Sequence, residues 1–83
     1  MTASRRAGAA SGRAAAIGEH LRIAGLALAG VELHPAADSG AVRAAWRGLP
    51  EDVALVVLTP FAAEALGSEA GESTAPLTVV LPP

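Results

Sequence analysis

The stretch RAAAIGEHLRIAGLALAGVEL, residues 13–33, contains two patterns that alternate along the chain. A short apolar run over 14–17 ends at a glycine and predicts a strand. Residues 20–29 are typical of a helix that stops at Gly30, and the alternating residues 31–34 predict a second strand that ends before Pro35. The stretch therefore predicts a strand–helix–strand unit, the building block of a parallel sheet.

The same alternation continues after this unit. Asp38 is a suitable N-cap for a second helix that runs to about Arg47. The run VALVVL, 53–58, is apolar at every position, which predicts a third strand covered on both faces. Thr59 followed by Pro60 is typical of the start of a short third helix.

The third helix is expected to end near Glu64, the residues 67–76 predict a flexible loop, and the run LTVVL, 77–81, predicts a fourth strand. Strands and helices thus alternate throughout, which is characteristic of an α/β domain. We expect a small flavodoxin-like three-layer sandwich with a four-stranded parallel sheet in the order 2-1-3-4, with helices on both faces and the third strand in the interior.

The domain is predicted to occupy residues 13–83. Residues 1–12 are small or basic and show no periodicity, so they predict a disordered N-terminal tail. Within the domain the central strands are expected to supply the core. We predict that Leu55, Val57 and Val80 are almost fully buried.

The composition excludes several kinds of chemistry. The 83 residues carry a net charge of -2, and all 6 basic residues are arginine. Nucleic acid is not expected as a partner, because it calls for a strongly basic surface. The sequence has no lysine for a Schiff base or a phosphate loop and no cysteine for thiol chemistry. No run approaches the roughly 20 apolar residues of a membrane span, so no direct membrane insertion is expected.

The turn after the first strand is not a phosphate-binding loop. A dinucleotide fingerprint needs three closely spaced glycines, whereas Gly18, Gly25 and Gly30 are widely separated. A receiver domain has the same order of elements, but it needs an aspartate at the end of strand three, where this chain has Leu58 and Thr59. Neither chemistry is therefore expected here.

The two histidines, His20 and His34, match no metal-binding spacing, and no third ligand type clusters near them in the sequence. Neither has the acid and nucleophile partners that hydrolytic catalysis requires. We expect no catalytic, cofactor-binding or metal-binding residues in this chain, and no cofactor.

The first predicted helix carries apolar residues on two opposite sides, although a surface helix normally has one apolar stripe. Either its small residues are tolerated anywhere and one leucine is exposed, or one side covers the sheet and the other meets a protein partner. On the second interpretation, the partner-binding residues are Ile23, Leu26 and Ala27, and the sheet is covered by Leu21, Ala24 and Leu28. An inverted helix would exchange the two sets.

Three segments together resemble one protein family. IGEHLRIAGLALAGVE is similar to the N-terminal signature of the F subunit of V/A-type rotary ATPases, with Gly18, Gly25 and the Leu-Ala-Gly of 28–30 at the matching positions. EDVALVVLTPFAAE and APLTVVLPP are similar to the third strand with its helix and to the fourth strand. The resemblance covers residues 14–83 and does not include the C-terminal helical segment of the family. The family's acidic loop is replaced here by Gly18-Glu19-His20.

The resemblance implies a non-catalytic component of the central stalk. A protein of this kind docks on the D subunit, which forms the shaft, and contacts other subunits of the V-type ATPase or ATP synthase. It supports ATP-coupled hydrogen or sodium ion transport, or ATP synthesis, at the cytoplasmic face of the membrane. The alternative is a stand-alone flavodoxin-like module that binds a small molecule or nucleotide at the carboxyl ends of strands one and three. The isolated chain is expected to form a weak symmetric homodimer.

Overall fold

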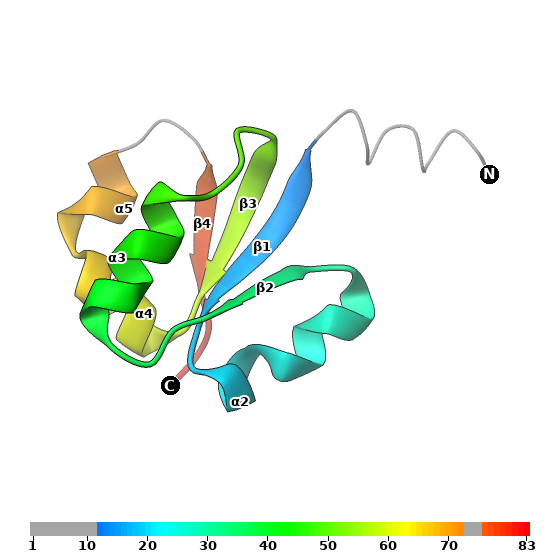
Figure 1. Ribbon diagram of the computed structural model, residues 1–83, viewed down its shortest axis with the longest axis horizontal. Helices are drawn as coiled ribbons and strands as arrows, with labels where there is room; N and C mark the ends of the chain where they lie inside the picture. Colours follow the sequence, from blue (N-terminus) through cyan, green and yellow to red (C-terminus); the bar gives the residue numbers. More distant parts are fainter. Residues whose placement is uncertain (1–11, 73–75) are drawn as a thin grey trace.

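The computed structural model describes residues 12–72 and 76–83 of the chain. The predicted tail lies outside the described residues except for Gly12, and so does part of the predicted loop, residues 73–75. The elements shown in Figure 1 are β1 (Arg13–Gly18), α2 (His20–Ile23), the 3-10 helix η1 (Ala24–Ala29), β2 (Glu32–Pro35), α3 (Ser39–Arg47), β3 (Val53–Leu58), α4 (Pro60–Leu66), α5 (Ser68–Glu72) and β4 (Leu77–Val80).

The four strands form one parallel sheet in the order β2-β1-β3-β4, which confirms the predicted topology. β3 lies in the interior, between β1 and β4. In Figure 1, α3, α4 and α5 gather on the left of the sheet, whereas α2 lies at the bottom and η1 continues from it to the right. The fold is therefore a small α/β flavodoxin-like domain.

The main core lies on the face of the sheet that α3 and α4 cover. Alternate residues of β1 and β3 point into it, and helical side chains fill the space above them. Its buried members include Ala15, Ile17, Val56, Leu58, Val42, Ala62 and Leu66. Because these residues come from two central strands and two helices, this layer fixes the position of both helices.

The opposite face of the sheet is covered by α2 and η1. Ala16 and Ile23 are fully buried, and neither belongs to the main core cluster. α2 and η1 pack mainly against β1 and β2, the first two strands in the order β2-β1-β3-β4. Helices thus lie on both faces, as predicted, but this second layer reaches over only half of the sheet.

The predicted helix starts are confirmed in atomic detail. Asp38 Oδ1 accepts a hydrogen bond of 2.7 Å from the Ala41 N–H at the start of α3. Thr59 Oγ1 accepts one of 3.2 Å from the Ala62 N–H at the start of α4. These caps satisfy backbone donors that have no partner inside a helix.

Two secondary-structure predictions are wrong in part. The first helix is α-helical only over His20–Ile23 and continues as a 3-10 helix over Ala24–Ala29. Glycine and alanine at 24, 25 and 27 offer few side-chain contacts that would hold the longer α-helix in place. The predicted loop 67–76 contains the short helix α5, whose Glu69 carboxylate forms an ion pair of 3.1 Å with Arg47 of α3.

The predicted burial of Leu55, Val57 and Val80 is also wrong. Leu55 and Val57 are half-buried, and Val80 is 51% exposed. The two β3 residues point to the face that α2 and η1 cover only in part, whereas Val56 and Leu58 point into the main core. Val80 lies on β4, at the edge of the sheet. An apolar run marks an interior strand, but it does not show that both of its faces are covered.

Candidate functional site

Ligands of doubly wound sheets bind at the carboxyl ends of the strands, at the point where the strand order reverses. In this sheet that place is the end of β1 and β3. Gly18 ends β1 directly against Thr59, and a Cβ atom on Gly18 would lie 2.8 Å from the Cβ of Thr59. The two strand ends are therefore closed onto each other by the Thr59 side chain.

Glu19 adds a carboxylate at the same place. The Thr59 hydroxyl, the backbone N–H of Glu19 and the nearby Arg22 lower the pKa of the Glu19 carboxyl below its ordinary value. Thr59 Oγ1 accepts from Ala62, so its proton is free to be donated to this carboxylate. Oε1 of Glu19 is buried and has no hydrogen-bond partner among the described residues.

The acidic groups at the strand ends disfavour the binding of a phosphate or another anion there. Glu19 is ionised at neutral pH, and Asp38 lies at the same edge, after β2. The N-termini of α3 and α4 are already capped, since the N–H groups of Ala41 and Ala62 donate to Asp38 and Thr59. A bound anion would have to displace these caps and face the carboxylate of Glu19.

The other candidate is an apolar surface on the side of the sheet away from α3 and α4. In a parallel pair, side chains in register lie on the same face. Leu55 is in register with Leu77, and Val57 is in register with Val79. All four side chains therefore point to one face, on which Leu77 is 72% and Val79 is 50% exposed. α2 and η1 pack chiefly on β1 and β2, and Arg22 of α2 reaches the end of β4, where it donates a hydrogen bond of 2.8 Å to the Pro82 carbonyl.

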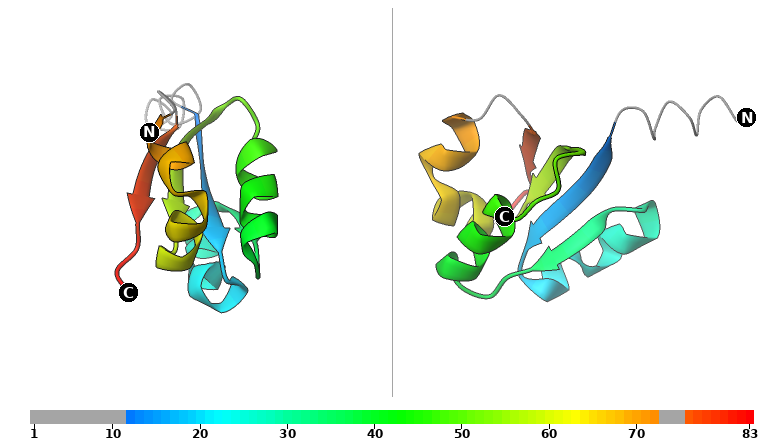
Figure 2. Two further views of the ribbon diagram at one scale, coloured as in Figure 1. Left: turned by 90° about the vertical axis from the view of Figure 1, so that its left-hand side faces the viewer. Right: turned by 45° about the horizontal axis from the view of Figure 1, so that its top comes forward.

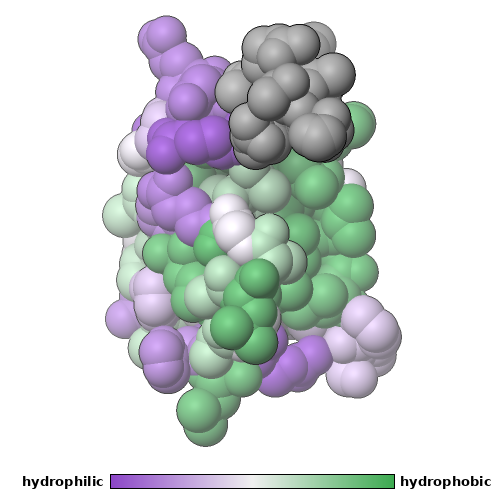
Figure 3. All heavy atoms as spheres, turned by 90° about the vertical axis from the view of Figure 1, so that its right-hand side faces the viewer, coloured by the Kyte–Doolittle hydropathy of each residue, from purple (hydrophilic) through white to green (hydrophobic). Residues whose placement is uncertain are grey.

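The same side of the molecule carries two further exposed leucines. Leu21 of α2 is 89% exposed and Leu28 of η1 is 96% exposed. We call the exposed surface on this side the open face; it consists of Leu55, Val57, Leu77 and Val79 on the sheet and Leu21 and Leu28 on α2 and η1. In Figure 3, hydrophobic residues gather over one flank of the molecule and hydrophilic residues over the other.

The predicted partner-binding residues of the first helix are inverted. Ile23 is fully buried against the sheet and Leu26 is half-buried, so of the three candidates only Ala27 is exposed. The apolar side chains that face outward are Leu21 and Leu28, which were expected to cover the sheet. The structure has the inverted orientation of this helix, in which Ile23 is buried and Leu21 is exposed.

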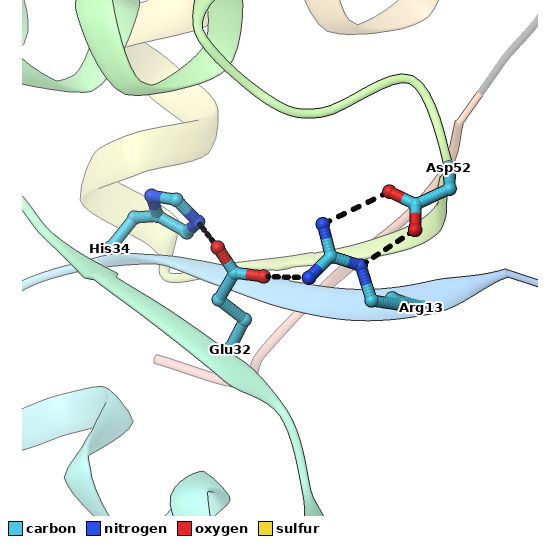
Figure 4. Close-up of polar contacts among 4 residues, drawn as sticks. All are labelled: Arg13, Glu32, His34 and Asp52. Carbon is cyan, nitrogen blue, oxygen red and sulfur yellow. Dashed lines mark hydrogen bonds and ion pairs between the residues drawn. The ribbon is translucent and has the colours of Figure 1, made fainter.

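Charged residues cluster instead near the amino-terminal ends of β1 and β3. Arg13 forms ion pairs of 2.9 Å with Glu32 and with Asp52, and His34 Nε2 lies 3.1 Å from Glu32 Oε2 (Figure 4). The Arg13 guanidinium joins the edge strand β2 to the turn before β3. Each of these exposed and half-exposed pairs contributes little stability. Together they connect β1 to β2 and to the turn before β3.

Among the described residues, no three metal-ligating side chains lie close enough together to hold an ion. His20 and His34 lie on α2 and β2 respectively. Within residues 12–72 and 76–83, no helix combines the length and the apolar character that crossing a bilayer requires.

Comparison of the chain with models of protein families, with curated proteins and with solved structures gives no match. The open face is therefore the feature on which a functional interpretation of this domain rests. Sequence reasoning placed Leu55 and Val57 in the core and did not single out Leu77 and Val79 as surface residues. The order of the elements could have predicted their exposure, because in a 2-1-3-4 sheet with right-handed crossovers only the connection between β1 and β2 lies on that face.

Proposed function

We propose that this domain is a non-catalytic docking block whose open face binds an α-helix of a partner protein. The observation that carries the proposal is that large apolar side chains are exposed together on one side of the sheet, over β3, β4 and the outer side of α2 and η1. Burying them would be favourable by about 25 cal/mol for each Å² of apolar surface removed from water.

The dimensions of the open face suit a helix. Neighbouring strands lie about 4.8 Å apart, and an α-helix with its side chains is about 10 Å wide. A single helix laid over β3 and β4, beside α2, would cover Leu55, Val57, Leu77 and Val79 together. It would complete the second helical layer, in which α2 and η1 pack chiefly on β1 and β2.

The resemblance to the F subunit of V/A-type rotary ATPases supports a specific choice of partner helix. In that family the partner is the D subunit, the coiled-coil shaft, and the block is part of the central stalk. We propose that this chain has the same role, and that it supports ATP-coupled ion transport without taking part in the chemistry. The ends of β1 and β3 favour this role over the small-molecule module. The Thr59 side chain occupies the position where a ligand would bind, and the Glu19 carboxylate would repel an anion.

Co-expression with the candidate shaft protein of the same organism tests the proposal. We expect the two chains to elute together on size exclusion. Titration of the chain with ATP and with a flavin, followed by calorimetry, tests the alternative module. Separate elution of the two chains, or micromolar binding of either small molecule, would contradict the docking role.

A further inference from the structure

Among the described residues, no further strand pairs with the outer edge of β4. β4 pairs with β3 on one side, and in the left view of Figure 2 it forms the flank of the sheet. The Leu81 N–H donates to the Leu58 carbonyl at 2.8 Å. Alternate residues of a strand bond to the same neighbour, so Leu77 and Val79 also bond toward β3. The N–H and C=O groups of Thr78 and Val80 therefore point outward, away from the sheet.

The two edges of the sheet differ in chemistry. β2, at the other edge, carries Glu32 and His34 and ends at Pro35, and Glu32 is held in an ion pair with Arg13. Charges and proline protect an edge from pairing with another strand. The edge of β4 has neither, because residues 77–81 contain no charged side chain and no proline.

We infer that two copies of this chain pair through β4 in an antiparallel arrangement and form one continuous sheet across a two-fold axis. Pro76 and Pro82 bracket the segment 77–81, and Val79 is its central residue. A two-fold axis at Val79 places Thr78 of each copy opposite Val80 of the other. Each such pair exchanges two N–H···O=C bonds, since these are the residues whose backbone groups point outward.

The side chains fit this register. Val79 lies opposite Val79 of the second copy in the closely spaced, non-hydrogen-bonded position, and Leu77 lies opposite Leu81. The contact contains no like charges, which a two-fold axis would otherwise bring together. A pairing of this length belongs to the small class of interface, below about 1,200 Å², so the dimer is weak and forms at high micromolar concentration. This inference does not rest on the shaft-docking proposal.

Variants with opposite charges at position 79 test the register of the β4–β4 pairing. Sedimentation velocity of the wild-type chain, from about 10 µM to about 1 mM, should show a monomer that becomes a dimer. Val79→Lys and Val79→Glu each place like charges opposite each other, so each variant alone should dimerise about tenfold more weakly or worse. An equal mixture of the two should form a one-to-one heterodimer. Both variants are expected to fold, because Val79 is half-exposed.

Ala44→Lys is the matched control, since it adds the same charge at an exposed position on α3, outside the open face. It should dimerise like the wild type. Three results would overturn the inference: a wild-type chain that stays monomeric at about 1 mM, a dimer that Ala44→Lys abolishes, or a mixture of the two Val79 variants that does not associate. Amide exchange gives a second measurement, in which Thr78 and Val80 become protected as concentration rises.

Discussion

Gly18 and Thr59 lie in direct contact where β1 and β3 end, and no space for a Cβ atom remains between them. This contact brings the start of α4 against the turn into α2 and closes the place where related folds bind ligands. It explains why a glycine follows the first strand although the turn has no phosphate to hold.

Gly18→Ala is expected to destabilise the domain, because its methyl group would overlap the Thr59 side chain. Overpacking of this kind costs about 1–3 kcal/mol. Gly25→Ala is the control, since a Cβ atom there meets no atom within 4 Å, and its effect should be within about 1 kcal/mol of zero. Urea denaturation of both variants measures the difference. Equal stability of Gly18→Ala and wild type would show that the two strand ends are not in contact.

Asp38→Ala should lower the free energy of unfolding by about 0.5–2 kcal/mol, because the Ala41 N–H loses its acceptor at the start of α3. Asp38→Asn keeps an acceptor oxygen and should lose much less. Thermal unfolding followed by circular dichroism distinguishes the two variants. A similar loss in both would mean that the carboxylate acts through its charge and not through the cap.

Glu19 should make stability depend on acid pH. The pKa of its carboxyl is lowered in the folded chain, chiefly by the Thr59 hydroxyl. The stabilisation is therefore complete above the ordinary value of 4.5 and is lost as the pH falls through the lower folded value. Urea midpoints measured from neutral pH down to about pH 3 should fall less steeply in Glu19→Gln than in wild type. Thr59→Ser keeps the hydroxyl and should keep the wild-type slope; a flat wild-type profile would refute the contact.

Leu58→Ala should cost about 2–5 kcal/mol, because Leu58 is fully buried in the main core between α3, α4 and the sheet. Leu77→Ala should cost less than about 1 kcal/mol, because Leu77 is largely exposed. Chemical denaturation of the two variants compares the covered and the open face directly. A large loss for Leu77→Ala would mean that the open face is covered in the isolated domain.

Local signals predicted most of the fold. Asp38 and Thr59 mark the two helix starts because their side chains cap the first turn, and the apolar run 53–58 marks an interior strand. The alternation of strands and helices, with right-handed crossovers, leaves few possible orders for the sheet. The order 2-1-3-4 could therefore be predicted without any knowledge of the contacts.

The open face could not be predicted residue by residue. A helical projection at 100° per residue fails after Ile23, where the chain continues as a 3-10 helix with a tighter turn. Which side of a helix meets the sheet depends on the approach of the whole segment, and this exchanged Ile23 with Leu21. Leu55 and Val57 have the same apolar character as Val56 and Leu58, and only the layer above them determines their burial.

The affinity of this chain for the shaft protein tests the central claim most directly, when measured by calorimetry on wild type and three variants. Leu28→Glu and Leu77→Glu place a carboxylate on the open face, whereas Ala44→Glu places one on the exposed side of α3. We expect wild type and Ala44→Glu to bind equally and the two open-face variants to bind at least about tenfold more weakly. Equal binding by all four chains, or no binding by wild type, would contradict this claim.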